Sequence, residues 1–372
     1  MDTLSDYILW MGDYPCSLTG FQEPDAVLLC LLSYIDYTPV IQNMSGEIRL
    51  RDCLPFAERG DLRVMITGEG RSYLEILKHA VESRRFGQLL LKDYLDLQRE
   101  EPPLQFSAVC FEDEDYSFLA FRGTDSSLAG WKEDFMISFT RTEAQELALA
   151  YAQNHLHPGR RWYMGGHSKG GNELLYAASH LTDEQWEMVD RIYLLDGPGL
   201  CPEVMSLDGM KRLDAKTTRI IPEFSVIGKL FEPDITDTRI VKSTATGILQ
   251  HGLSTWGIDH GKLACTDNND PLSEWINETL ALWIGDITQE ERPVFVEELF
   301  DALSAGGATS FNEFGKDGTE GLEAVLKQFR NTSEMTRKTI SELPKQAFRI
   351  GLDQLRQRIG DSVQKLSDDS KV

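Results

Sequence analysis

The spacing of apolar residues changes from a helical to a strand-like rhythm in the first third of the chain. Residues 24–37 and 74–97 carry apolar side chains at helical spacing, and the second stretch predicts one or two helices. Short apolar runs then predict strands at residues 106–111 and 116–121. Because only the acidic turn 113–115 separates these strands, we expect them to form a hairpin.

Helices and strands alternate along the middle of the chain. The pattern predicts a helix at 143–154, a strand at 162–164, a helix at 172–181, and strands at 192–195 and 219–221. Such alternation is typical of βαβ units. The sequence therefore predicts an α/β fold with a mainly parallel central sheet flanked by helices.

The pattern beyond about Pro271 is helical to the end of the chain. One apolar stripe there consists of Leu352, Leu355, Ile359, Val363 and Leu366. We expect an α/β domain over residues 1–300 and a helical C-terminal extension over residues 301–372. From Gly321 onward ten Lys and Arg face seven Asp and Glu. This mild basicity leaves contact with a membrane surface open as an alternative, although such a stripe more often packs against protein.

The composition and charge of the chain limit the classes of molecule that it is expected to bind. The chain has 372 residues, 41% of them apolar, which supports a substantial buried core. Its 37 Lys and Arg against 60 Asp and Glu give a net charge of −23, which would repel nucleic acid. The first residues have no basic segment ahead of an apolar one, and the longest apolar run, 26–32, is too short to span a membrane. We expect a cytoplasmic protein.

The cysteines do not form a metal-binding or disulfide pattern. They are widely separated, with no C-x-x-C pair and no neighbouring histidine cluster: Cys16, Cys30, Cys53, Cys110, Cys201 and Cys265. Cys30 and Cys110 sit inside apolar runs and are predicted to be core residues. We expect reduced thiols, with a disulfide framework as the minor alternative, and no metal.

The pentapeptide Gly166-His-Ser-Lys-Gly170 follows a predicted strand and opens a predicted helix. This is the setting of a nucleophile elbow, a turn so tight that the residues two before and two after the serine must lack side chains. The serine is held in a strained conformation at a helix N-terminus, which favours a developing oxyanion. Ser168 is therefore the candidate nucleophile. The alternative is an ordinary glycine-rich turn with a capping serine.

A serine nucleophile needs a base, and the chain has seven histidines. Five are poorly placed, because they lie in the elbow itself, about 18 Å along the following helix, or before the elbow strand: His167, His180, His79, His155 and His157. The other two follow the nucleophile in the chain order expected of α/β-hydrolases. His251, in a loop context after the last strand, is the preferred base, and His260 is the alternative.

A carboxylate should orient the imidazole and stabilise its charged form. Asp196 directly follows the strand 192–195, and active sites collect residues at the C-terminal ends of parallel strands. Its alternative role is to cap the turn at Gly197-Pro198. Glu223, after the next strand, is the rival acid.

The oxyanion hole needs two backbone N–H groups. Thr124 lies just after a strand and a glycine, and Lys169 directly follows the nucleophile, so their amides are the candidate donors. The alternative for the stretch around Thr124 is a polar turn. Trp131 and Asp134 follow closely, and for them a buried aromatic and a helix-start carboxylate are as plausible as a role in the site.

The stretches Ala120-Phe-Arg-Gly-Thr-Asp-Ser126, Trp131-Lys-Glu-Asp134 and Gly166-His-Ser-Lys-Gly-Gly171 together resemble the class 3, fungal-type lipases. A bacterial branch of that superfamily is also similar at Asp25-Ala26, Asp196-Gly-Pro-Gly199, Pro222-Glu-Phe-Ser225 and Gln250-His251. The resemblance covers about residues 1–300. It implies an α/β-hydrolase fold and ester hydrolysis, with Ser168 as nucleophile and His251 as base.

The chain departs from that family at two places. Lys169 stands where such lipases usually carry Leu. The strand at Ile220-Ile221 continues into Pro222-Glu-Phe-Ser225, where class 3 lipases place the acid, whereas Asp196 resembles the strand-end Asp of the pancreatic-type lipases.

These features favour a serine hydrolase acting on a carboxylic ester or thioester, with a small-molecule or monoacyl-lipid substrate and no cofactor. Acyl transfer to an acceptor other than water is a close variant. A non-catalytic scaffold or binding protein of the same fold is the alternative from another class, and the helical tail would then serve as a partner surface. The segment 197–217 is either a lid or, preferably, an ordinary surface helix.

Overall fold

The computed structural model describes residues 1–66, 70–99, 101, 104–124, 141–201, 204 and 207–271, followed by the separate residues 273, 274, 277, 291, 294, 298 and 333. The chain divides into two compact units, Met1–Asp270 and Pro271–Val372. In the second unit, the backbone N–H and the hydroxyl of Ser333 donate to Glu298 at 2.9 and 2.7 Å. The boundary expected at residue 300 and the stripe from Leu352 to Leu366 lie outside the described residues.

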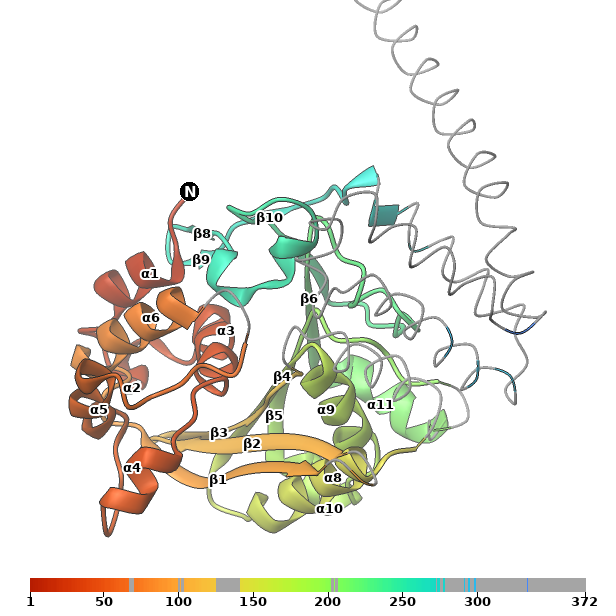
Figure 1. Ribbon diagram of the computed structural model, residues 1–372. Helices are drawn as coiled ribbons and strands as arrows, with labels where there is room; N and C mark the ends of the chain where they lie inside the picture. Colours follow the sequence, from red (N-terminus) through yellow and green to blue (C-terminus); the bar gives the residue numbers. More distant parts are fainter. Residues whose placement is uncertain are drawn as a thin grey trace, which may run out of the picture. The chain divides into compact units, whose positions relative to one another are not determined.

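One twisted sheet organises the first unit (Figure 1). Over the described residues it has eight strands, in the order β1-β2-β3-β4-β5-β6-β7-β10. Their bounds are β1 (Leu90–Arg99), β2 (Leu104–Glu112), β3 (Tyr116–Phe121), β4 (Arg161–His167), β5 (Val189–Leu195), β6 (Thr217–Pro222), β7 (Thr238–Val241) and β10 (Cys265–Thr266). Strands β3 to β7 are mutually parallel, and β1, β2 and β10 pair antiparallel. The mixed α/β fold with a large parallel section is as predicted. A separate hairpin pairs β8 (Ile258–Asp259) with β9 (Lys262–Leu263).

Helices precede the sheet and connect its strands. Before β1 come α1 (Leu4–Met11), α2 (Cys16–Thr19), α3 (Glu23–Leu32), α4 (Thr38–Asn43), η1 (Leu50–Cys53), α5 (Leu54–Arg59) and α6 (Gly70–Glu82). Later come α8 (Glu143–His155), α9 (Lys169–Ser179), α10 (Asp183–Met188), α11 (Leu207–Lys216), η2 (Gly247–His251) and η3 (Leu253–Thr255). Capping boxes start α8, at Thr142 and Gln145, and α10, at Thr182 and Gln185. No helix among the described residues has the length and apolarity to cross a bilayer.

The sheet is covered on both faces. Side chains alternate between the faces of a strand, so a sheet buried on both sides needs two apolar layers. On β5, Tyr193 and Leu195 join one core with residues of α1, α3 and α6, whereas Ile192 and Leu194 join a second core with residues of α8 and α9. The N-terminal helices thus lie over one face, and α8 and α9 over the other (Figure 1).

Most of the predicted elements are present, and one is wrong. The hairpin of β2 and β3 and the strands β4, β5 and β6 are confirmed, as are helices α3, α8 and α9. Residues 74–97 were expected to form one or two helices, but the helix ends at Glu82 and an edge strand begins at Leu90. A β-bulge between Lys92 and Leu95, with Asp93 at φ 50°, breaks the alternation that would reveal a strand.

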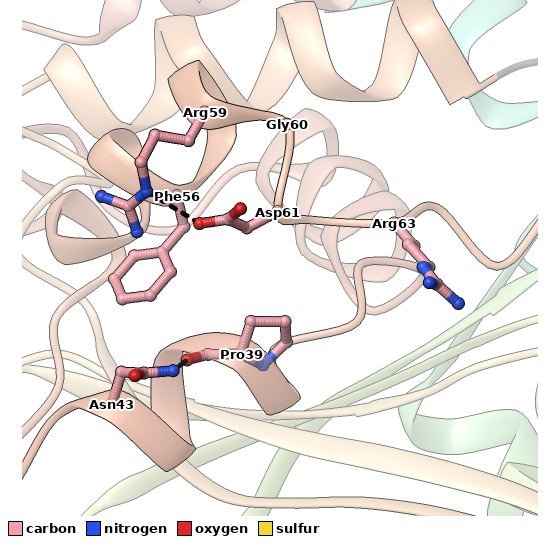
Figure 2. Close-up of a pocket in the computed structure, with 7 residues that line it drawn as sticks. All are labelled: Pro39, Asn43, Phe56, Arg59, Gly60, Asp61 and Arg63. Carbon is pink, nitrogen blue, oxygen red and sulfur yellow. Dashed lines mark hydrogen bonds and ion pairs between the residues drawn. The ribbon is translucent and has the colours of Figure 1, made fainter.

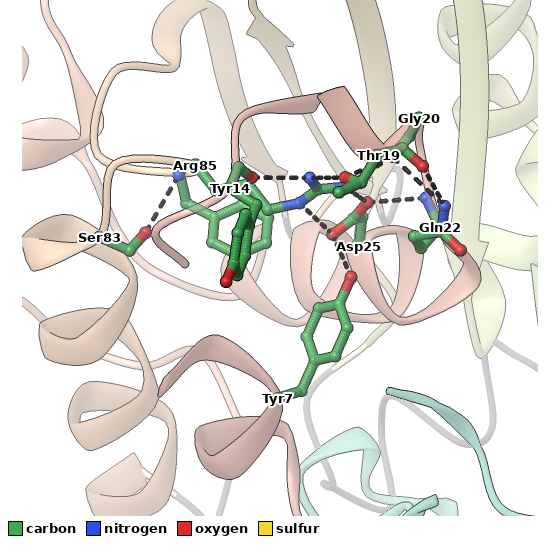
Figure 3. Close-up of polar contacts among 9 residues, drawn as sticks. Tyr7, Tyr14, Thr19, Gly20, Gln22, Asp25, Ser83 and Arg85 are labelled. Atoms are coloured by element: carbon green, nitrogen blue, oxygen red, sulfur yellow. Dashed lines mark hydrogen bonds and ion pairs between the residues drawn. The ribbon is translucent and has the colours of Figure 1, made fainter. Parts of the chain in front are cut away.

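A buried ion pair fastens the N-terminal helices to one another (Figure 3). Arg85, just after α6, donates from Nε to Asp25 Oδ1 at 2.9 Å, and a terminal nitrogen contacts the other carboxylate oxygen. The same guanidinium donates to the Tyr14 carbonyl at 3.0 Å and the Thr19 hydroxyl at 2.8 Å, while the Tyr7 hydroxyl donates to Asp25. Both charged side chains are 1% exposed. Asp25 therefore ties α1, α2, α3 and the end of α6 together.

The substitution Asp25→Asn should destabilise the fold strongly, because it leaves the Arg85 charge buried without its counter-ion. We expect the free energy of unfolding in urea to fall by roughly 3–5 kcal/mol. The matched control is Asp61→Asn, which breaks an exposed pair with Arg59 at 2.8 Å and should cost less than about 1 kcal/mol. Equal losses in the two variants would contradict the proposed importance of the buried pair.

Candidate active site

The turn between β4 and α9 holds Ser168 in an unusual backbone conformation. Its φ is 58° and its ψ is −131°, a region that residues with a side chain rarely adopt. A Cβ on Gly166 would come within 2.2 Å of the Gly170 carbonyl oxygen, and a Cβ on Gly170 within 2.3 Å of the Phe121 carbonyl oxygen. Both glycines of the pentapeptide are therefore required sterically, as expected for a nucleophile elbow.

The structure brings Asp196 and His251 together. Asp196 follows β5 and is 1% exposed, and His251 ends η2 and is 16% exposed. The distance from His251 Nδ1 to Asp196 Oδ2 is 2.6 Å. Because an ionised carboxylate only accepts hydrogen bonds, Nδ1 carries the proton and Nε2 carries the lone pair of the neutral ring. This is the tautomer that a general base needs.

The second carboxylate oxygen of Asp196 is also engaged. Oδ1 accepts from the Ser225 hydroxyl at 2.5 Å and from the Gly228 N–H at 3.2 Å. These donors compensate a buried charge and fix the orientation of the carboxylate. Ser225 belongs to the Pro222–Ser225 stretch quoted above, but the sequence alone did not assign it a role.

The structure records other hydrogen-bond partners for the rival acid and base. Glu223 directly follows β6, and its backbone N–H donates to the Val241 carbonyl at 3.2 Å. His260 lies in the turn between β8 and β9, with its side chain 93% exposed and its Nδ1 2.7 Å from Asp259. Asp196 and His251 are thus the carboxylate and imidazole that meet beside the elbow.

The loop after β3 approaches the serine closely. A Cβ on Gly123 would be 2.7 Å from Ser168 Cβ, so only a glycine allows this approach. The neighbouring Thr124 is 6% exposed. Arg122 anchors the loop, since its guanidinium donates to both oxygens of Asp96 on β1 at 3.2 and 2.9 Å. The loop that carries the first candidate oxyanion donor therefore lies against the nucleophile; Trp131 and Asp134 lie outside the described residues.

Lys169 offers its backbone at the start of α9, while its side chain leads away from Ser168. The ammonium donates to the Gln105 carbonyl at 2.7 Å and lies 3.8 Å from Glu173 Oε1, one helical turn farther on. Both charged side chains are at most 1% exposed. A lysine thus fits where class 3 lipases usually carry leucine because its charge is balanced within the fold.

His167, the residue before the nucleophile, takes part in two hydrogen bonds. Its Nδ1 is 2.7 Å from the Tyr34 hydroxyl, and its Nε2 is 2.9 Å from the His251 carbonyl oxygen. The rings of His167 and His251 have centroids 4.5 Å apart. Burial first, and the nearby His251 second, hold the pKa of His167 well below its ordinary value of 6.5. The hydrogen bond to His167 holds the His251 backbone next to the elbow.

Five of the six thiols are buried, Cys265 is exposed, and none of the six forms a disulfide. Cys30 and Cys110 are 0% and 1% exposed. Burial raises the pKa of Cys16, Cys53 and Cys110 to about 12, which makes them unreactive. No cluster of three or more metal-ligating side chains occurs in the described part of the chain.

A cavity of about 570 Å³ lies between α4 and α5 (Figure 2). Its lining residues are Pro39, Asn43, Phe56, Arg59, Gly60, Asp61 and Arg63. None of them belongs to the elbow, to the carboxylate or to the base described above. We therefore assign this cavity no part in the candidate site.

The family of the chain follows from a family-model match that contains all of the preferred site residues. A model of the Mbeg1-like family matches residues 80–301, which is more than half of the chain. The chain belongs to the Mbeg1-like family. The match includes the four elements that carry Thr124, Ser168, Asp196 and His251, whereas the family model does not extend over α1 to α5.

A solved structure is also similar to this family member. The crystal structure of the M37 lipase aligns with 16% sequence identity and a TM-score of 0.33, over 56% of this chain and 70% of the lipase chain. No curated protein matches the chain.

We expect the His167 ring to keep its proton on Nε2 and to remain neutral at pH 6.5, where an ordinary histidine is half protonated. The unfolded chain binds one more proton below this pH, so stability is lost as the pH falls, by up to about 1.4 kcal/mol per pH unit from this residue. Ring ¹⁵N chemical shifts, read beside urea unfolding at several pH values, measure both effects. A His167 ring that titrates near pH 6.5 would contradict the expectation.

Proposed function

We propose that this chain is a serine hydrolase of the α/β-hydrolase fold that cleaves a carboxylic ester or thioester. One observation carries the proposal: the hydrogen bond of 2.6 Å between His251 and a buried Asp196, beside a serine in a strained elbow. The proximity of a candidate nucleophile, a candidate base in the required tautomer and a candidate orienting acid supports this proposal. The resemblance to class 3 lipases supports the same reaction.

In the proposed reaction, His251 Nε2 takes the proton of the Ser168 hydroxyl while Oγ attacks the substrate carbonyl carbon. Asp196 stabilises the imidazolium that forms. The oxyanion accepts hydrogen bonds from the backbone N–H groups of Thr124 and Lys169. When the C–O or C–S bond breaks, His251 returns its proton to the leaving alcohol or thiol, and an acyl-Ser168 ester remains.

Water then completes the cycle. His251 takes a proton from the water, whose oxygen attacks the acyl carbonyl, and the serine leaves with that proton restored. Each step uses side chains and amides of this chain. Transfer to another hydroxyl or thiol acceptor would pass through the same acyl-enzyme.

The charge of the chain bears on the substrate. A net charge of −23 opposes approach to an anionic bilayer. We therefore propose soluble esters or monoacyl lipids rather than bulk anionic membranes. A panel of p-nitrophenyl esters of increasing chain length measures the acyl preference.

Purified protein should react with a fluorophosphonate probe at a single site, because only an activated serine attacks such a probe readily. We expect one adduct by intact mass in the wild type, none in Ser168→Ala, and slow labelling in His251→Ala. A known serine hydrolase labelled in parallel controls for the probe. Failure of the wild type to react, with and without detergent, would overturn the proposal in favour of a non-catalytic scaffold.

Two isosteric substitutions decide between the candidate acids. Asp196→Asn should lower kcat for ester hydrolysis on the order of 10³- to 10⁴-fold, because an amide cannot hold His251 in the productive tautomer as a carboxylate does. Glu223→Gln should change kcat less than about threefold. The opposite ranking would assign the acid to Glu223.

A further inference from the structure

Four groups far apart in the sequence are linked by hydrogen bonds behind the elbow. Tyr34 follows α3, Gly123 follows β3, His167 ends β4 and His251 ends η2. The Gly123 N–H donates to the Tyr34 hydroxyl at 3.2 Å, and the bonds of 2.7 and 2.9 Å already described join Tyr34 to His167 and His167 to the His251 carbonyl. We call this set the Tyr34–His167 relay.

The direction of each bond in the relay is determined by chemistry. A carbonyl oxygen can only accept, so His167 Nε2 must carry the proton. The neutral ring then accepts at Nδ1, and the Tyr34 hydroxyl donates to it. Because the proton of the Tyr34 hydroxyl is already donated to His167, its oxygen accepts a hydrogen bond from the Gly123 N–H. The relay therefore runs in one direction, from the Gly123 amide to the His251 carbonyl.

We propose that Tyr34 and His167 are positioning residues that hold the oxyanion loop and the base in register with Ser168. The inference rests on the proposed serine-hydrolase function and deepens it. Tyr34 and His167 touch no reacting atom. Tyr34 acts on the loop next to Thr124, and His167 acts on the backbone of the base.

Burial makes the relay stiff. Tyr34 is 0% exposed, His167 is 1% exposed, and the two rings pack edge to face at 5.6 Å. Losing one bond would leave a buried donor or acceptor unsatisfied, which costs more than the bond itself contributes. The Gly123 backbone lies so close to Ser168 Cβ that a small shift of the loop would change the geometry of attack.

The relay also suits the charge that develops during catalysis. The lowered pKa of His167 keeps its ring neutral while His251, at 4.5 Å between centroids, becomes an imidazolium. A charged His167 would oppose that step and would turn Nδ1 into a donor facing the Tyr34 hydroxyl. A neutral, doubly hydrogen-bonded imidazole avoids both problems.

The test compares Tyr34→Phe with Tyr37→Phe in the full-length chain. Both tyrosines are 0% exposed, and the Tyr37 hydroxyl donates to the Leu32 carbonyl at 2.9 Å, away from the elbow. Each variant therefore loses one buried hydroxyl and keeps its ring. On a p-nitrophenyl ester we expect Tyr34→Phe to lower kcat roughly 10- to 100-fold with KM changed less than about twofold. Tyr37→Phe should stay within about twofold of the wild type in both constants.

A second pair of variants examines the His251 end of the relay. His167→Gln can keep an amide donor near the position of Nε2, whereas His167→Asn is too short to reach the His251 carbonyl. We expect the glutamine variant to retain at least several-fold more kcat than the asparagine variant at similar thermal stability. Equal activity of these two variants would refute the proposed role of the hydrogen bond between His167 and the His251 carbonyl.

The outcomes separate the relay from the proposed reaction. A wild type that neither hydrolyses esters nor takes up the fluorophosphonate probe refutes the serine hydrolase and the relay with it. A wild type that reacts, with Tyr34→Phe and Tyr37→Phe equal in kcat, refutes the relay alone. If Tyr34→Phe unfolds, the His167→Gln and His167→Asn pair decides the question in its place.

Discussion

The turn from β4 into α9 leaves no room for a side chain on either of its outer glycines, and this constraint determines what can surround Ser168. The Phe121 carbonyl packs against Gly170, and the Gly123 backbone packs against Ser168 itself. Close backbone contact on two sides means that neighbouring loops are positioned by sterics as much as by hydrogen bonds. The position of the proposed nucleophile is therefore fixed by the packing of neighbouring strand ends against the turn.

Buried charge around the turn is compensated group by group. The two oxygens of Asp196 are divided between an imidazole and a pair of donors from the loop after β6, and Lys169 lies beside Glu173 inside α9. Such compensation is compatible with the role proposed for Asp196 after β5, whereas class 3 lipases place the acid after the next strand. The C-terminal ends of β5 and β6 lie at the same edge of the sheet, because the two strands are parallel neighbours.

Local signals predicted much of this arrangement, and long-range contacts account for the rest. The elbow and its flanking elements follow from glycine spacing and short apolar runs. The position directly after a strand led to Asp196 as the preferred acid, and the chain order led to His251 as the preferred base. The strand β1 could not be predicted, because its bulge disguises the alternation and its outer residues are exposed. Tyr34 carries no local signal at all, since its contact with His167 spans 133 residues.

The N-terminal helices have a consequence for where the folded unit begins. The Mbeg1-like match starts at residue 80, inside α6, yet the layer before it covers the face of β5 that carries Tyr193 and Leu195 and contains Asp25, the counter-ion of Arg85. A fragment cut at the family boundary would lose most of the helical layer over one face of the sheet and expose that face to solvent. Changes upstream of residue 80 would thus be transmitted to the elbow, although every group proposed to touch substrate lies downstream.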